Sequence, residues 1–330
     1  MPAQDLSRTG TRRKVYQARG PPATHMASTT VYLSAARDRA EALGRLLSAV
    51  DLSGIRGQPV TVKANYNSAD PFPASTHPDT LAAIVRAVQA AGATAVTLAE
   101  RSGMGTTRRV LEERGVVRLA ASLGFRAVPL DGTGRDGWTK VKEPGLHWQD
   151  GFWISREVTA AGCVVQTCCC KTHRYGGHFT LSLKNSVGLV ARKVPGDPHD
   201  YMQELHTSPH QRRMIAEINR FYPVTLVILD ATEAFASGGP DRGRVVTPGV
   251  ILAGSDRVAM DCAGVALLRS FGSTPEVMQG RIRDLEQIAR AEELGVGTSD
   301  PSRIRLEPLD PAAEGIADEI REQMAPVKPP

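Results

Sequence analysis

The sequence has few aromatic residues, no long apolar run and no block of basic residues. Aromatic side chains make up 5% of its 330 residues, and the net charge of +5 is spread thinly along the chain. Nucleic-acid-binding proteins usually carry a basic face, with aromatic rings available to stack on single-stranded bases. No stretch approaches the 18 or so apolar residues that a membrane-spanning helix needs. We therefore expect neither a nucleic-acid partner nor a membrane partner.

Cysteine is also scarce, and its placement excludes a disulfide framework. Three of the five cysteines are adjacent, at 168–170, and neighbouring cysteines are poorly placed to pair. A chain of this length buries enough core to be stable without cross-links. Arg12-Arg13 suggests a twin-arginine export signal, but residues 14–26 lack the apolar segment that such a signal requires. The sequence therefore predicts a protein of the reducing cytoplasm.

Common cofactor motifs are missing. Gly103-Met104-Gly105 lacks the third glycine of a dinucleotide fingerprint, and the acidic Glu100 precedes it rather than follows. The chain has no Gly-x-x-x-x-Gly-Lys-Ser/Thr run for ATP and no Cys-x-x-Cys-x-x-Cys run for an iron–sulfur cluster. We predict no NAD, no ATP and no resident cofactor, and a metal ion stays open.

Alternating strand and helix patterns predict an α/β fold. Apolar strands at 30–33, 59–65 and 95–99 are separated by helical periodicity at about 36–50 and from Pro78 to Gly92. Strands joined through a helix by short connections run parallel. We therefore predict a mostly parallel central sheet with helices on both faces, in a Rossmann-like layering. Further helices are expected near 106–122, 182–189, 200–220 and 256–271, and further strands at 127–130, 163–170, 224–230 and 245–253.

One large domain with two loose ends is expected. Residues 1–27 are polar and lack periodicity, which is typical of a disordered arm. The domain should span 28–310, followed by a peripheral tail over 311–330. Residues 131–150 are rich in Gly, Asp, Lys and Trp and are predicted to be an insertion that acts as a lid. A homodimer is compatible with this plan.

A series of short motifs runs through the chain in a fixed order. They are Val62-Lys63-Ala64-Asn65, Ser75-Thr76-His77-Pro78, Ala90-Ala91-Gly92-Ala93, Lys171-Thr172-His173, Leu181-Ser182-Leu183-Lys184-Asn185, Asp230 with Glu233, Gly239-Pro240 with Gly243, and Ala253-Gly254-Ser255-Asp256 before Val258-Ala259-Met260-Asp261. Over roughly residues 30–310 this series resembles the domain-of-unknown-function family 362, a bacterial family whose chemistry is largely unassigned. Many members carry an added ferredoxin-like iron–sulfur module, for which this chain has no motif.

Polar residues gather where the first predicted strands end. Lys63 and Asn65 end one strand, and Thr76-His77 precede the next helix. Ligands of α/β proteins bind beyond the carboxyl ends of strands, and a helix N-terminus favours an anion. We expect Lys63, Asn65 and Thr76 to bind substrate and His77 to take part in catalysis. The alternative is that His77 only caps the helix.

The segment 168–178 holds the strongest candidates for proton transfer. Histidine titrates near neutrality, and a lysine close to other cations can have its pKa lowered. We expect Lys171 and His173 to be catalytic, with His178 beside the substrate. The alternative is a solvated loop end.

Cys169 stands where the family commonly has a lysine, within Pro-Lys-Leu before Lys-Thr-His. Strand alternation places it on the same face as Lys171 and opposite to Cys168 and Cys170. Three roles stay open for Cys169, namely a packed hydrophobe, a thiol activated by Lys171 or His173, and a metal ligand together with His173.

Further candidates lie downstream. Ser182, Lys184 and Asn185 open a helix after a glycine-rich turn and could hold a carboxylate or phosphate. His206 could reach the sheet edge, although Pro209 interrupts the helix face that it would share with other histidines. Glu233, with Asp230, follows a buried strand and suits an acidic wall opposite the lysines.

Together these residues predict an enzyme that acts on a small anionic metabolite by general acid–base chemistry. Isomerisation, elimination or cyclisation next to a carbonyl would fit, in specialised metabolism. Lys63, Lys184 and Asn185 would hold the anion, while Lys171 and His173 would move protons and Glu233 would orient or accept. Two alternatives stay open, namely a metal- or iron–sulfur-linked redox protein using Cys169 and His173, and a metabolite-binding module without turnover.

Overall fold

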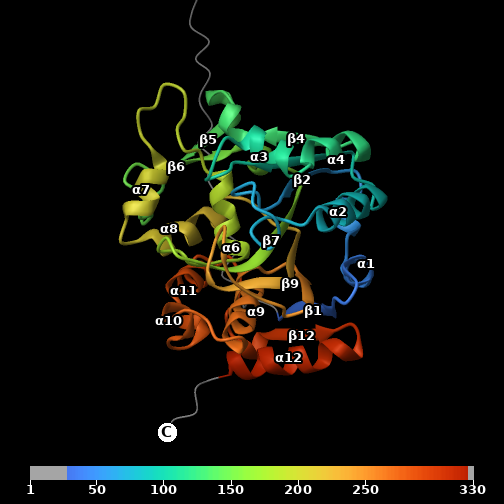
Figure 1. The fold of residues 1–330 in the computed structure, drawn as a ribbon. Coiled ribbons are helices and arrows are strands. Elements are labelled where there is room, and N and C mark those ends of the chain that lie inside the picture. The colour runs from blue at the N-terminus through green and yellow to red at the C-terminus, as the bar shows by residue number, and fades with distance from the viewer. Residues whose placement is uncertain (1–27, 326–330) are drawn as a thin grey trace, which may run out of the picture.

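A mixed sheet of mostly parallel strands forms the centre of the computed structural model, which describes residues 28–325 (Figure 1). The predicted arm, 1–27, lies outside the described residues. The strands of this sheet are β1 (Thr29–Ala35), β2 (Pro59–Lys63), β3 (Ala95–Glu100), β4 (Arg126–Pro129), β7 (Cys163–His173), β8 (His178–Thr180), β9 (Leu226–Gly238), β10 (Gly243–Val246), β11 (Val250–Gly254) and β12 (Ile304–Pro308). A separate hairpin pairs β5 (Trp138–Val141) with β6 (Phe152–Ser155).

The strand order confirms the predicted α/β architecture. Along the sheet the order is β12-β1-β11-β9-β7-β2-β3-β4, with β10 added to β9 and β8 added to β7. Pairing is parallel from β9 through β7, β2 and β3 to β4, and between β12 and β1. β11 runs antiparallel to both of its neighbours. The carboxyl ends of β2, β3 and β7 therefore meet at one edge of the sheet.

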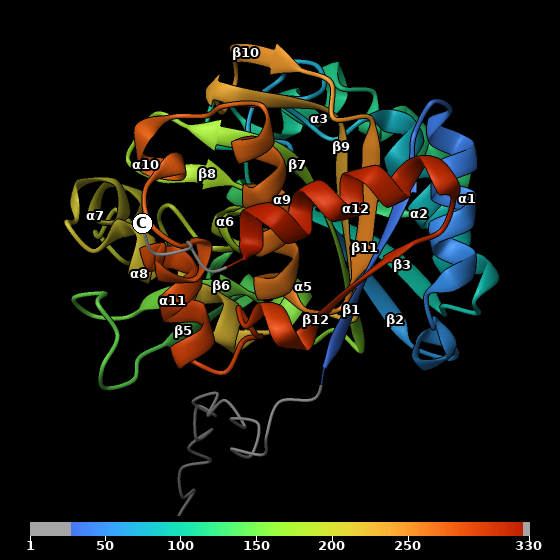
Figure 2. The same ribbon diagram turned by 90° about the horizontal axis from the view of Figure 1, so that it is seen from below.

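Helices cover both faces of the sheet (Figure 2). They are α1 (Arg39–Ala49), α2 (Pro78–Ala90), α3 (Thr107–Glu113), α4 (Val116–Leu123), α5 (Arg156–Thr159), α6 (Ser182–Asn185), α7 (Tyr201–Thr207), α8 (Gln211–Ile218), α9 (Arg257–Ser270), α10 (Pro275–Met278), α11 (Glu286–Glu293) and α12 (Pro311–Met324). Helices α9 and α12 share one hydrophobic cluster with Cys168 and Cys170 of β7. Helices α1 and α2 share another with Val60 and Val62 of β2. Within residues 28–325, no helix has the length and apolar character needed to cross a membrane.

Helix α2 shows how local sequence sets this arrangement. Pro78 occupies its first turn, where the missing N–H costs nothing. Leu81, Ile84, Val85 and Val88 recur at helical spacing and are fully buried, as the sequence predicts. Each such side chain contributes roughly 1.5–3 kcal/mol on burial.

Two predicted helices are each divided in two. The segment 106–122 splits into α3 and α4 because Gly115 adopts a positive φ of 74°, which ends the first helix. The segment 200–220 splits into α7 and α8 at Ser208-Pro209, since proline cannot continue a helix from within. The predicted cap Asp256 is present, accepting hydrogen bonds from the N–H groups of Val258 at 2.8 Å and Ala259 at 3.0 Å.

The predicted peripheral tail and the predicted lid both contain residues that pack into the hydrophobic clusters. Residues 311–324, expected in a peripheral tail, instead form α12, whose Ala313, Ala317 and Ile320 are fully buried in the cluster around α9. The proposed lid, 131–150, contains β5 and buries Trp138 and Trp148 in a third hydrophobic cluster. Among the described residues that line the cavity discussed below, none belongs to 131–150. The insertion is therefore fastened to the core by its buried tryptophans and does not line the cavity.

Candidate functional site

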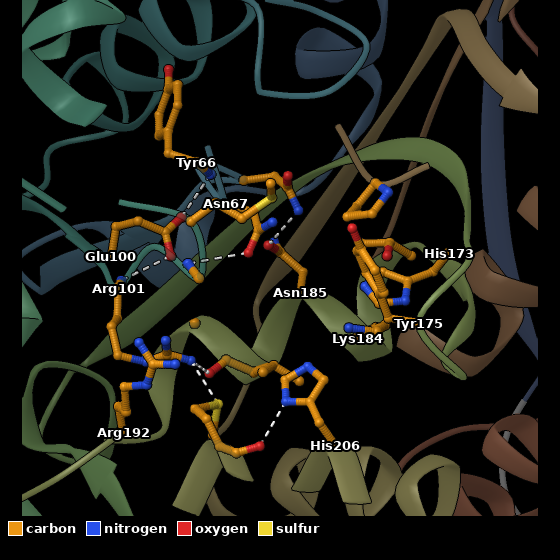
Figure 3. Close-up of a pocket in the computed structure, with 18 of the residues that line it drawn as sticks. Tyr66, Asn67, Glu100, Arg101, His173, Tyr175, Lys184, Asn185, Arg192 and His206 are labelled. Atoms are coloured by element: carbon orange, nitrogen blue, oxygen red, sulfur yellow. Dashed lines mark hydrogen bonds between the residues drawn. The ribbon is translucent and has the colours of Figure 1, made fainter. Parts of the chain in front are cut away.

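A cavity of about 560 Å³ opens at the sheet edge where β2, β3 and β7 end (Figure 3). Its lining combines cationic, acidic and amide side chains from segments far apart in the sequence. The polar lining residues are Lys63, Asn65, Tyr66, Asn67, Glu100, Arg101, Lys171, His173, Tyr175, Thr180, Lys184, Asn185, Arg192, Asp200, Gln203, His206 and Thr207. Five of these are Lys or Arg and two are Asp or Glu, so the cavity favours an anion.

Lys63 is held in a buried ion pair. Its Nζ lies 2.8 Å from Oε2 of Glu100 and 3.1 Å from Oδ1 of Asn185, and it also donates to the carbonyl of Ala64. Burial lowers the pKa of Lys63, and the neighbouring Glu100 carboxylate opposes that shift. Glu100 in turn accepts hydrogen bonds from the N–H groups of Tyr66 and Arg101, both at 2.9 Å. The charge of Lys63 is therefore compensated within the protein.

Lys171 is fully hydrogen-bonded. Its Nζ donates to Oδ1 of Asn65 at 3.0 Å, to the carbonyl of Pro240 at 3.0 Å and to the carbonyl of Ala74. An ammonium has three N–H donors, so none is left for a ligand. Burial lowers the pKa of Lys171. The geometry makes Lys171 an anchor for Asn65, whose Nδ2 reaches Oδ1 of Asn185 at 3.3 Å.

Lys184 differs from the other two lysines. It is 7% exposed and lines the cavity, and among residues 28–325 its Nζ has no hydrogen-bond or ion-pair partner. Burial, reinforced by the positive charges of Lys171 and Arg101, lowers its pKa to about 7. Lys184 is therefore present as a neutral amine in a large fraction of molecules near pH 7.

Two histidines lie in the same part of the cavity (Figure 3). His173 is buried, and its Nδ1 has no hydrogen-bond partner among the described residues. Burial lowers its pKa well below the usual value, and the charge of Lys184 adds to the shift. The Nδ1 of His206 lies 2.6 Å from the carbonyl of Met202, and burial lowers the pKa of this side chain too. Both imidazoles are therefore neutral at pH 7.

Two arginines complete the positive character of the site. Arg101 is buried, with its guanidinium donating to the carbonyls of Val190 at 2.7 Å and Val187 at 2.9 Å. Burial lowers the pKa of Arg101 to about 10, so it stays charged at neutral pH without a ligand-facing role of its own. Arg192 is 63% exposed and lies 3.7 Å from Asp200. Its planar fork of donors is accessible to a carboxylate or phosphate.

Seven of the predicted site residues line this cavity. They are Lys63, Asn65, Lys171, His173, Lys184, Asn185 and His206. They come from β2 and the loop after it, from β7, α6 and α7, so these segments converge at the strand ends. The assigned roles of the lysines need revision, however, because the free amine among the described residues belongs to Lys184 rather than to Lys171.

Four other predicted residues do not line the cavity. His77 caps α2, its Nδ1 accepting from the N–H of Asp79 at 3.2 Å, which is the alternative that the sequence left open. The Oγ1 of Thr76 accepts from the N–H of Asn65 at 2.8 Å. The N–H of Ser182 donates to Asp261 at 2.7 Å. His178 is half-buried at the start of β8.

Cys169 and Glu233 also lie outside the lining. Cys169 is 1% exposed, and burial raises the pKa of its thiol to about 12, so the thiol is protonated at neutral pH. Glu233 is displaced by a bulge, because the register with β7 jumps from Asp230 to Ala234. Within residues 28–325, no group of three or more His, Cys, Asp and Glu side chains is arranged to hold a metal ion.

Asp230 does not form the expected acidic wall. Its carboxylate instead binds Arg39 at 3.0 Å and the hydroxyl of Thr80 at 2.6 Å. The acidic residue that faces Lys63 is Glu100, which the sequence reasoning considered only for a dinucleotide motif. Glu100 ends the strand next to β2, so the rule of strand ends that selected Lys63 could have selected it.

Comparison with known proteins places the chain in a family without assigning a reaction. Residues 60–266 match a family described as "Domain of unknown function (DUF362)". Among solved structures, the chain is similar to the lactate racemase apoprotein from Thermoanaerobacterium thermosaccharolyticum, with 14% identity and a TM-score of 0.44. The similarity covers 72% of this chain but only 57% of that one. No curated protein matches the sequence.

Proposed function

The chain belongs to the domain-of-unknown-function family 362, and from its cavity we propose that it is an enzyme that acts on a small anionic metabolite by general acid–base chemistry. The observation that supports this proposal most strongly is the state of Lys184. It is an uncompensated amine with a pKa of about 7, beside a cavity lined by more cations than anions. A base whose pKa lies near the working pH is the most effective at proton transfer.

The side chains divide into a fixed frame and a reactive group. Lys63, Glu100 and Asn185 satisfy one another, and Lys171 anchors Asn65, so these residues hold the shape and potential of the cavity. Their hydrogen bonds are formed before any ligand arrives, which avoids reorganisation during a reaction.

Lys184, His173 and Arg192 form the reactive group. Arg192 binds the carboxylate or phosphate of the substrate at the accessible end. Neutral Lys184 removes a proton from a carbon next to a carbonyl, and His173 exchanges a proton with the carbonyl oxygen. Isomerisation, elimination and cyclisation all begin with this step. This assignment moves the base from Lys171, where the sequence suggested it, to Lys184.

No specific observation favours the redox alternative. That alternative needs Cys169 as a ligand or nucleophile, and its thiol is buried away from the cavity lining with a raised pKa. The binding module without turnover uses the same cavity, and the experiment below distinguishes it from the enzyme.

Deuterium exchange tests the proposal even while the product is unidentified. The full-length protein is incubated in D2O with a panel of 2-oxo and 2-hydroxy carboxylates and with a bacterial small-molecule extract. Loss of proton signal next to a carbonyl is followed by NMR. We expect exchange in at least one component, and its loss in Lys184→Met. Lys142→Met is the matched control, because Lys142 is 68% exposed and lies outside the cavity lining.

The outcomes separate the candidate functions. Exchange that survives in Lys184→Met contradicts the proposed base. A component that binds tightly to the wild-type protein and never exchanges supports the binding module instead.

A further inference from the structure

Lys184 has the geometry of a nucleophile as well as that of a base. A neutral amine at the edge of a cavity can attack a carbonyl carbon and form an imine. We propose that Lys184 forms a Schiff base with a substrate of the 2-oxo carboxylate class. This inference rests on the proposed function for the anionic substrate. While Lys184 is held in the imine, His173 takes its place as the base that removes the proton.

The partners of the three cavity lysines single out Lys184. Lys63 donates to Glu100 and Asn185, and all three donors of Lys171 are occupied by protein oxygens. An ammonium held in this way has no free lone pair. Among the described residues, Lys184 is the cavity lysine whose Nζ has no such partner, although its side chain is almost fully buried.

The Lys184 and His173 side chains both pass close to Gly177. A Cβ atom at position 177 would stand 2.4 Å from Cε of Lys184 and 3.1 Å from Nδ1 of His173. Both side chains therefore lie over the same glycine, and a Cβ at this position would displace the end of Lys184 from where it stands. The Nδ1 of His173, which has no hydrogen-bond partner among the described residues, therefore lies on the same side of the cavity as the Lys184 amine. From this position the imidazole can exchange protons with an intermediate bound to Lys184.

The charge and size of the cavity indicate the substrate class. A carbonyl is needed for the imine, and the excess of Lys and Arg over Asp and Glu favours a carboxylate beside it. A volume of about 560 Å³ accepts a metabolite larger than pyruvate.

The chemical step balances without an oxidant or a reductant. The lone pair of Nζ attacks the carbonyl carbon, and the electrons of the C=O bond move to oxygen, which takes up a proton. The resulting carbinolamine then loses its hydroxyl group with a proton as water, and nitrogen forms the double bond to carbon. The protonated imine withdraws electrons from the adjacent C–H bond, so that a neighbouring imidazole can remove that proton. Return of a proton to carbon from the imidazolium restores the protonated imine, and addition of water then reverses the earlier steps, releasing the carbonyl product and the free amine of Lys184.

Reductive trapping tests the Schiff base directly. The full-length protein is incubated at pH 7 with pyruvate, 2-oxoglutarate or glyoxylate and sodium cyanoborohydride, and the adduct is located by peptide mass spectrometry. We expect labelling of Lys184 at least tenfold faster than of Lys142, which is 68% exposed and lies outside the cavity lining. Lys184→Met should show no label at this site, and His173→Asn should slow the labelling of Lys184.

The inference is overturned if none of the three 2-oxo acids labels Lys184 in the wild-type protein while Lys142 becomes labelled in the same sample. This comparison uses only the wild-type protein, so a variant that fails to fold does not affect it. Deuterium exchange without an adduct would leave the acid–base proposal intact and refute the imine. An adduct without exchange on any component would support the imine and refute the acid–base proposal.

Discussion

The buried amine of Lys184 should make the stability of the protein depend on pH in a predictable way. In the unfolded chain Lys184 holds its proton up to its usual pKa of 10.5, whereas in the folded protein its pKa is about 7. Between these values the unfolded state binds more protons, so stability rises with pH through this window. Replacing Lys184 by Met removes this linkage and fills similar apolar volume.

The magnitude follows from the two pKa values. Holding Lys184 in the folded state costs about 4 kcal/mol at pH 7 and about 2 kcal/mol at pH 9, because each pKa unit corresponds to 1.36 kcal/mol. Relative to Lys184→Met, the wild-type protein should therefore gain about 2 kcal/mol of unfolding free energy between pH 7 and pH 9. Below pH 7 the difference should level off, because Lys184 is then protonated in the folded protein as well as in the unfolded chain.

Urea unfolding of both proteins at several pH values measures this difference. Subtracting the variant from the wild type cancels the titration of groups that Lys184 does not influence, and the neighbouring His173 stays neutral in this pH range because burial lowers its pKa well below the usual value. Lys142→Met should give a difference that does not change with pH, because Lys142 is 68% exposed. A wild-type minus Lys184→Met difference that is flat between pH 7 and pH 9 would refute the lowered pKa, and the assignment of Lys184 as base would lose its support.

Three further substitutions probe the frame of the site and a control position. Glu100→Gln leaves Lys63 buried without its counter-charge, so the free energy of unfolding, measured by urea titration, should fall by about 3–5 kcal/mol. A fall of less than about 1 kcal/mol would contradict the buried pair. Gly177→Ala places a Cβ 2.4 Å from Cε of Lys184, so the lysine side chain must move. Deuterium exchange and reductive labelling should slow at least tenfold, and unchanged rates would show that the position of Lys184 over Gly177 is not required. Asp256→Ala removes the cap of α9 and should cost about 1 kcal/mol while leaving both rates unchanged; a lowered rate would link this cap to the site.

Much of the fold could be predicted from periodicity, since helical and strand spacing is a local property of the sequence. The segments missed are those where that signal is weak. Helix α12 buries Ala313, Ala317 and Ile320, whose spacing is helical, but alanines among acidic residues give a faint pattern. The division at Gly115 depends on a positive φ, which a single glycine in a sequence does not reveal.

The candidate site was predictable in position and less so in the roles of its residues. The rule that ligands bind at strand ends selected Lys63 and Lys171, and both line the cavity. Which lysine stays free depends on the partners Glu100 and Asn65, and these contacts join residues far apart in the sequence. Glu233 was misplaced because a bulge in β9 changes the register with β7, and bulges leave little trace in residue patterns.

The burial of the cysteines has a practical use in the laboratory. All five, Cys163, Cys168, Cys169, Cys170 and Cys262, are free and buried. A thiol reagent added to the native protein should therefore find no ready target, and its reaction would report the opening of the core. The natural sequence is for the same reason a suitable background for attaching a spectroscopic probe. One cysteine introduced at the exposed rim of the cavity would accept the label and report ligand binding, with no native thiol to remove first.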